Sequence, residues 1–340
     1  MKQLFPALLA ICLFLSGCSA VKPQQKQYTA TFLDLFDTVT TVVGKADSQE
    51  SFKETAQKVH DELLIFHQLF DIYNNHEGIN NLKTVNDQAG IAPVKVDGRI
   101  IELLKDAKTY HKLSDGRVNV AMGSVLSLWH DARNDGRNDP VNAALPEYDA
   151  LKAASGHTDI DNLTIDETNS TVYLSDPEMS LDVGAIAKGW AVQKVAESSP
   201  SGLLISVGGN VCATGPKDAS GIRWVIGIQN PDDSSAYLHT IYVTKGSVVT
   251  SGDYQRTYMV DGKAYHHIID PDTLYPSTYW RSVSIVCEDS GLADALSTAL
   301  FNLSLEDGQK LLTACGAEAL WVDAEGKLYY SPGFRDLIKK

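Results

Sequence analysis

Residues 181–189 read LDVGAIAKG, a short apolar run that passes into a segment rich in glycine and alanine. The apolar start is typical of a strand, and the small residues after it are typical of a helix opening, so we predict a helix over Ala185–Glu197. Small side chains let a ligand approach the backbone, and a helix N-terminus favours anions. Lys188 lies close enough to this start to reach a phosphate, although an ordinary surface lysine is the alternative. The stretch has no GxxxxGK[ST] pattern, so it does not predict a P-loop.

On both sides of this stretch, helical and β-like patterns alternate irregularly. A helical stripe predicts helices over Ser51–Phe70 and over Ile100–Leu113, with Asp97 near the start of the second. Asn119–His130 is apolar and is expected to line the interior, whereas Asp131–Pro146 is polar and is predicted to be a surface loop. The remaining elements are a helix over Ala293–Leu303 and strands over Leu203–Val207, Trp224–Ile228, Thr240–Val243, Val283–Val286 and Ala319–Val322. This order lacks the regular alternation of a doubly wound sheet and predicts an α+β fold.

The N-terminus has the make-up of a lipoprotein signal. A short apolar run ends in Leu15-Ser16-Gly17-Cys18, which resembles the bacterial lipobox. We therefore predict a signal peptide over residues 1–17, a lipidated Cys18 with a polar tether over 18–30, and a folded body over 31–340. An ordinary cleavable signal that contains a cysteine is the alternative. No later run reaches about 18 apolar residues, so the mature chain is expected to be anchored to a membrane and not to span it.

Charge and cysteine content exclude several classes of protein. The formal net charge is −14, with no basic stripe, which argues against nucleic-acid binding and against a polybasic membrane surface. A phosphate-bearing ligand is still compatible with this charge, because metal ions and backbone amides neutralise it locally. Cys212, Cys287 and Cys315 are widely spaced in apolar surroundings. Their spacing predicts buried thiols and neither a disulfide framework nor a zinc site.

Two glycine-containing stretches follow β-like runs. Paired glycines in Val207–Asn210 allow a tight turn against a ligand or a neighbouring chain segment. Val249–Tyr254 is interpreted as a polar loop after a strand. Its candidate contacts to a polar ligand are Thr250, Ser251, Gly252 and Asp253. Ordinary turns are the alternative for both stretches.

Adjacent histidines mark a fourth stretch, Tyr265–Pro271. In an extended chain the two side chains point to opposite faces, so one of them at most serves a given site. A histidine beside Asp270 suits proton transfer, while a structural role is the alternative for each ring.

The fifth stretch, Leu292–Leu300, is helical in pattern and places Asp294 and Thr298 four residues apart, on one face. Oxygen ligands of this kind suit a hard cation such as Mg²⁺. The surrounding residues are apolar, and a buried carboxylate without a partner is costly, so a metal partner is favoured over a plain helix contact.

The order DVGAIAKGWA, ISVGGN, VTSGDY, HHIIDP, ADALSTALF resembles the ApbE family, the FAD:protein FMN transferases. The resemblance extends from about Asp34 to Val322 and is densest between Asp182 and Phe301. It implies an ApbE-like fold with mixed, mostly antiparallel sheets and packed helices. It also implies Mg²⁺ as cofactor, FAD as substrate, and an acceptor protein modified on Ser or Thr, with release of AMP. Many members are lipoproteins, so it implies a bacterial envelope protein, lipid-anchored and facing outside the cytoplasm, with a membrane or extracellular redox protein as partner.

Residue roles follow from the same resemblance. The carbonyl of Ala185 with Asp294 and Thr298 is expected to hold Mg²⁺, and His267 is expected to be the general base, assisted by Asp270. The remaining expected contacts to FAD are Phe36, Tyr73, Arg117, Val118, Asn119, Asp182, Lys188 and Ile268. Phe36 and Asn119 depart from the family's Met and Asp, which leaves the contacts at those two positions open.

Two other functions stay compatible with these residues. Attack by water in place of a hydroxyl would make the protein an FAD pyrophosphatase that yields FMN and AMP. A lipoprotein that binds FAD without turnover is the other, although simple flavin binding does not need Asp294 and Thr298 as metal ligands.

Overall fold

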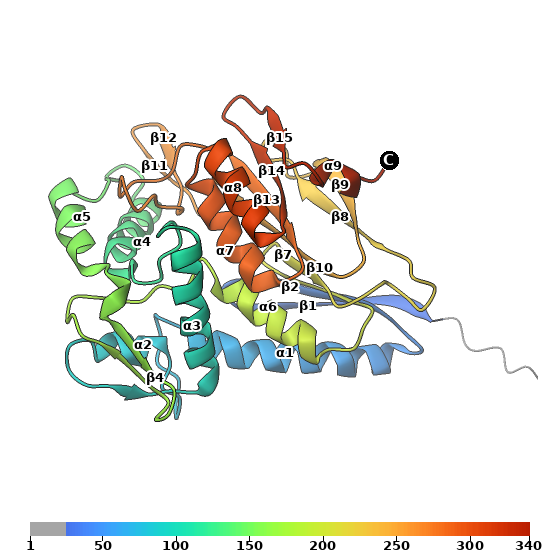
Figure 1. Cartoon of the computed structure of the whole chain (residues 1–340), viewed down its shortest axis with the longest axis horizontal. Helices are drawn as coiled ribbons and strands as arrows, with labels where there is room; N and C mark the ends of the chain where they lie inside the picture. Colours follow the sequence, from blue (N-terminus) through green and yellow to red (C-terminus); the bar gives the residue numbers. More distant parts are fainter. Residues whose placement is uncertain (1–24) are drawn as a thin grey trace, which may run out of the picture.

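A computed structural model describes residues 25–340, so the predicted signal peptide and Cys18 lie outside the described residues. The centre is an eight-stranded sheet in the order β1-β2-β6-β7-β10-β13-β14-β15, in which every neighbouring pair is antiparallel (Figure 1). Its strands are β1 (Lys26–Leu35), β2 (Thr38–Ala46), β6 (Leu203–Val207), β7 (Asn210–Ala213), β10 (Gly246–Gly252), β13 (Ser282–Cys287), β14 (Glu318–Val322) and β15 (Leu328–Tyr330).

Helices cover one face of this sheet. They are α1 (Gln49–Phe70), α6 (Ala187–Ser198), α7 (Ser290–Phe301) and α8 (Leu305–Cys315), and α6 lies between α1 and α7 in Figure 1. Ser48 begins α1 by accepting a hydrogen bond from the Ser51 N–H at 3.1 Å. Nearly every residue of α7 is buried, which explains its apolar sequence on all sides: it packs between β10, β13, α6 and α8.

The opposite face is covered by the hairpin β8 (Trp224–Gln229) and β9 (Tyr237–Val243) with the short helix α9 (Phe334–Leu337). Trp224, Ile241 and Phe334 are buried there against Val248 and Leu320 of the sheet. Both faces of the sheet are therefore packed.

A smaller assembly lies beyond one end of α6 and α7, at the left of Figure 1. It contains α2 (Leu82–Asp87), α3 (Gly98–Leu113), α4 (Gly123–Asn138), α5 (Tyr148–Ala154), two short 3₁₀ turns (Ser155–His157 and Ile160–Asn162), and a sheet of β3 (Val94–Lys95), β5 (Thr171–Leu174) and β4 (Leu163–Asp166). The hairpin β11 (Tyr258–Val260) and β12 (Lys263–Tyr265) packs on α4. The candidate site lies where this assembly meets the large sheet.

The predicted α+β fold with antiparallel sheets is confirmed, but some boundaries were wrong. Residues 131–138 are not loop: α4 continues to Asn138 because Gly136 packs under the Tyr258 ring, where a Cβ would lie 2.8 Å from a ring carbon. β1 begins at Lys26, inside the predicted tether, since Tyr28 stacks on Phe52 with ring centroids 5.7 Å apart. Thr250–Gly252 belong to β10 and not to a loop.

Candidate functional site

The first and fifth motifs meet where α6 crosses α7. The Gly189 N–H donates to the Asp294 carboxylate at 2.7 Å. A Cβ on residue 189 would lie 2.3 Å from the Ser290 carbonyl oxygen and 2.4 Å from the Asp294 Cβ. Glycine is therefore required for the two helices to approach this closely, and the approach brings a backbone donor to a buried carboxylate.

The second and third motifs reach the same point from the sheet. The Ser251 hydroxyl at the end of β10 is hydrogen-bonded to the Ser297 hydroxyl at 2.8 Å, and Ser297 donates to the Asp294 carbonyl at 2.8 Å. Asn210 at the start of β7 is buried, and its amide lies close enough to lower the pKa of Asp294, although its Nδ2 has no regular hydrogen bond. Four of the five motifs thus converge on one carboxylate.

Asp294 has the setting of a cation ligand. It is 5% exposed, and burial raises its pKa, opposed by Lys188 and by the Gly189 N–H. Of the other expected ligands, Ala185 lies in the turn that precedes α6 and Thr298 lies one turn after Asp294 on α7, and both are partly exposed. Residues 25–340 contain no cluster of three or more His, Cys, Asp or Glu side chains that would hold a metal by themselves. One carboxylate, a hydroxyl and a carbonyl fit Mg²⁺, because this ion completes its shell with water and substrate phosphates.

The two adjacent histidines have different surroundings. The His266 Nε2 donates to the Ser277 carbonyl at 2.8 Å and its Nδ1 accepts from the Ile268 N–H at 3.2 Å, so both ring nitrogens are occupied. The His267 Nδ1 is buried without a hydrogen-bond partner among the described residues. Of the two rings, His267 is therefore the one that is free to exchange a proton with a ligand.

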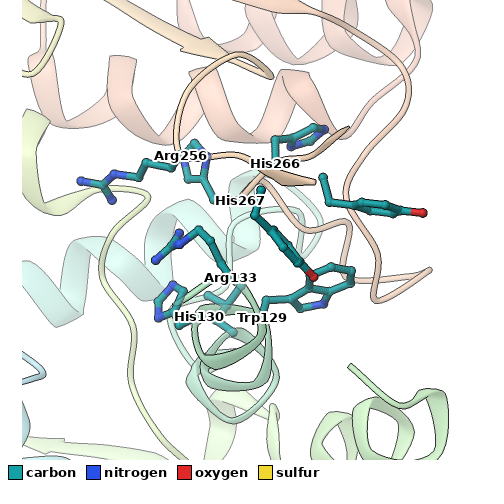
Figure 2. A pocket seen from close by; sticks show the side chains of 9 residues that line it. Trp129, His130, Arg133, Arg256, His266 and His267 are labelled. Carbon is teal, nitrogen blue, oxygen red and sulfur yellow. The ribbon is translucent and has the colours of Figure 1, made fainter. Parts of the chain in front are cut away.

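His267 borders a cavity between α4 and the β11–β12 hairpin (Figure 2). Its pKa is lowered to about 3, first by burial and then by the positive charges of Arg256, Lys188 and Arg133. The ring is consequently neutral at physiological pH, with an unprotonated nitrogen. The side chains that line the cavity are those of Leu126, Trp129, His130, Arg133, Arg256, Tyr258, Tyr265, His266 and His267.

Asp182 and Tyr73 meet at His130, a residue that sequence reasoning missed. The Tyr73 hydroxyl lies 3.0 Å from His130 Nδ1, and His130 Nε2 lies 3.8 Å from the Asp182 carboxylate. Burial, opposed by Asp182, lowers the pKa of His130. Burial and Asp182 together raise the pKa of Tyr73 to about 12, although 57% of this residue is exposed. Asp182 also accepts from the Gly184 N–H at 2.8 Å, which fixes the turn before α6.

The Asp270 carboxylate contacts Arg117 and Asp272, and it does not contact the free nitrogen of His267. Its carboxylate pairs with Arg117 at 3.3 Å and accepts from the Asp272 N–H at 2.9 Å, and Asp272 pairs with Arg117 at 2.5 Å. Among residues 25–340, Asp270 has no hydrogen bond to His267. The predicted pair of His267 and Asp270 is therefore not in direct contact, and Arg117 is held by two carboxylates.

The other predicted contacts are distributed around these groups. Phe36 has a left-handed backbone at the β1–β2 turn, with φ 52°, and its N–H donates to His67 at 3.2 Å. Val118 and Ile268 are buried. The remaining side chains already have partners: Asn119 bonds Ala121 and Thr158, Thr250 bonds Ser284, Asp253 pairs with Arg281 at 3.4 Å, and Lys188 reaches the Gly184 carbonyl at 3.4 Å.

Comparison with known proteins identifies the family of the chain. A model of the ApbE family matches residues 35–321. An FAD:protein FMN transferase of Treponema pallidum is 34% identical over 313 residues, which cover 84% of each chain. Its counterpart in Escherichia coli K12 is 26% identical over 349 residues, 98% of this chain and 96% of the relative. Among solved structures, the ApbE protein of Thermotoga maritima superposes with a TM-score of 0.81 at 29% identity, covering 93% of this chain and all of the other. The flavin transferase ApbE of Vibrio cholerae gives 0.76 at 25% identity, over 92% and 100%.

The chain belongs to the ApbE family. The resemblance inferred from the five motifs is confirmed.

Proposed function

We propose that this chain transfers FMN from FAD to a Ser or Thr hydroxyl of an acceptor protein and releases AMP. By homology it is an enzyme, an FAD:protein FMN transferase. The observation that carries the proposal is the convergence of a buried carboxylate, Asp294, and an unoccupied imidazole nitrogen, that of His267, around Lys188.

The proposed reaction assigns each group one task. His267 accepts the proton of the attacking hydroxyl, whose oxygen forms a bond to the FMN-side phosphorus while the bond from that phosphorus to the AMP oxygen breaks. Lys188 binds phosphate oxygens next to this point. Asp270, through Arg117, fixes the turn that follows Ile268 and so the position of His267.

A divalent cation is part of the proposal. Ala185, Asp294 and Thr298 would hold Mg²⁺, which when bound neutralises phosphate charge and polarises phosphorus. The cost of burying the Asp294 carboxylate supports this assignment, because a cation offsets it.

We further propose that Cys18 carries a lipid and that the enzyme works on the outer side of a bacterial membrane, on a membrane or extracellular redox protein. None of the helices in residues 25–340 has the length and apolarity required to cross a bilayer. The support for the anchor is the sequence Leu15–Cys18.

Mass spectrometry of a candidate acceptor after incubation with the full chain, FAD and Mg²⁺ tests the function. We expect an FMN adduct on one Ser or Thr and stoichiometric AMP, both absent for the acceptor with that residue changed to Ala. Free FMN and AMP without an adduct would instead indicate the pyrophosphatase. Bound FAD without AMP would indicate a binding protein.

A further inference from the structure

Arg133 and Arg256 differ in their contacts from the other arginines of the described residues. Arg99, Arg117 and Arg281 pair with aspartates, Arg137 donates to the Thr257 carbonyl, and Arg223 and Arg335 lie over tyrosine rings. Within residues 25–340, Arg133 and Arg256 make no hydrogen bond, ion pair or cation–π contact, and the Nε of Arg133 is buried without a hydrogen bond. Burial lowers the pKa of Arg133, and the carboxylate that acts against this shift is that of Asp182, which forms no ion pair with it. In a chain with a net charge of −14, two cations without a direct internal partner indicate an external anion.

Both arginines lie at the cavity beside His267. Figure 2 shows Arg133 and Arg256 on the same side of the cavity as His130, with the His267 ring next to Arg256. Lys188 is close enough to His267 to act on its charge as well, and it has no ion pair among the described residues. Three cations therefore surround one neutral imidazole.

The fold holds these two arginines in place through Arg137. Arg133 and Arg137 are four residues apart on α4, so they share a face of the helix. Arg137 donates to the Thr257 carbonyl at 3.0 Å and thereby ties the loop that carries Arg256 to α4. Arg256 has φ 47°, a left-handed conformation that is unfavourable for a residue with a side chain, so the surrounding contacts must hold it there.

The charge change of the proposed reaction matches this cluster. Each phosphate of FAD carries about one negative charge, and the transfer converts a diphosphate into a phosphodiester and a phosphomonoester. The products carry about one negative charge more than the reactants, and the balancing proton goes to the base. Lys188 supplies one positive charge close to His267, and the two arginines supply two more at its cavity.

We propose that Arg133 and Arg256 bind the phosphate oxygens of FAD next to His267 and stabilise the charge that develops on the departing AMP phosphate. This inference rests on the proposed function and adds two catalytic residues to it. The positive charge around His267 also makes protonation of the ring unfavourable until a phosphate is bound, which couples proton uptake to the presence of substrate.

Binding and turnover of FAD by the full chain in detergent test the proposal separately. We compare Arg133→Gln, Arg256→Gln and Arg256→Lys with Arg223→Gln, an exposed arginine that stacks on Tyr242 away from the site. Flavin fluorescence measures the Kd for FAD and for riboflavin, which has no phosphate, and chromatography measures AMP release with Mg²⁺. Thermal unfolding of each variant checks that it is folded.

For each glutamine variant we expect the Kd for FAD to rise and AMP release to fall by about tenfold or more, with the Kd for riboflavin unchanged. Arg256→Lys should recover part of the loss, and Arg223→Gln should match the wild type. Folded glutamine variants with wild-type FAD binding and AMP release would overturn the inference, and a loss confined to the rate of protein labelling would assign the arginines to the acceptor instead. If the wild type binds FAD but neither releases AMP nor labels protein, the proposed function fails, and the comparison of FAD with riboflavin still decides whether the arginines bind phosphate.

Discussion

Gly189→Ala is the sharpest perturbation of the contact between α6 and α7. The added Cβ would lie 2.3 Å from the Ser290 carbonyl oxygen and 2.4 Å from the Asp294 Cβ, so the helices must separate. Overpacking of this kind costs about 1–3 kcal/mol. Weakening the 2.7 Å bond from the residue 189 N–H to the carboxylate adds about 1.5–3 kcal/mol. The higher helix propensity of alanine offsets about 1 kcal/mol of this loss of stability.

We therefore expect Gly189→Ala to reduce the free energy of unfolding by about 1.5–5 kcal/mol, which lowers the Tm of a chain of this length by about 2–8 °C. The matched control is Gly98→Ala in the first turn of α3, where an added Cβ meets nothing within 4 Å. Differential scanning calorimetry measures both variants, and AMP release is titrated with Mg²⁺. The Mg²⁺ concentration for half-maximal rate should rise in Gly189→Ala alone. Equal Tm and equal Mg²⁺ dependence in the two variants would refute the reasoning.

Three further predictions concern single side chains. Asp294→Asn keeps an acceptor for the Gly189 N–H but removes a buried charge. Without Mg²⁺, the Tm of this variant at pH 7 should equal or exceed that of the wild type. With Mg²⁺, its rate of AMP release should fall by at least about tenfold. An undiminished Mg²⁺-dependent rate would contradict the ligand assignment. His267 has a pKa of about 3 in the folded chain and about 6.5 when unfolded, so the stability it contributes is present above pH 6.5 and is lost as the pH falls toward 3, by up to about 1.4 kcal/mol per pH unit. His267→Gln should flatten this acid limb in urea unfolding series between pH 7 and pH 4, and an unchanged slope would show that the ring is protonated normally. Cys18→Ser should move the protein from the membrane fraction to the soluble fraction of cells; continued membrane association would exclude the lipid anchor.

The sequence predicted the site best at positions where the chemistry of the residue restricts the role that it can have. Asp294 stands out because a carboxylate in an apolar helix needs a partner, and the structure gives it the Gly189 N–H within a site built from four motifs. His267 was predicted to be the general base from the family resemblance. The structure gives a physical reason to prefer it over His266, because both ring nitrogens of His266 are occupied by hydrogen bonds. Both residues were predicted from the sequence, and the tertiary contacts supply the physical reasons afterwards.

Contacts between segments that are distant in the sequence could not be predicted from local residue patterns. The polar composition of residues 131–138 favours a loop, yet Arg137 and Gly136 are helical because the β11–β12 hairpin packs on them. Arg133 and Arg256 are more than a hundred residues apart, so no local pattern indicates that they meet at His267. Asp270 lies beside the histidines in sequence, but its carboxylate faces Arg117.

The crossing of α6 and α7 has a consequence for how the enzyme matures. Asp294 meets Gly189, a residue 105 positions earlier, and Ser251 of the sheet through Ser297. Such contacts close long loops and form late compared with local structure. During synthesis, a chain that ends before α7 has made every strand as far as β13 but does not yet contain the carboxylate. Catalytic competence is thus acquired near the end of folding, and a partly folded chain has no complete site with which to consume FAD.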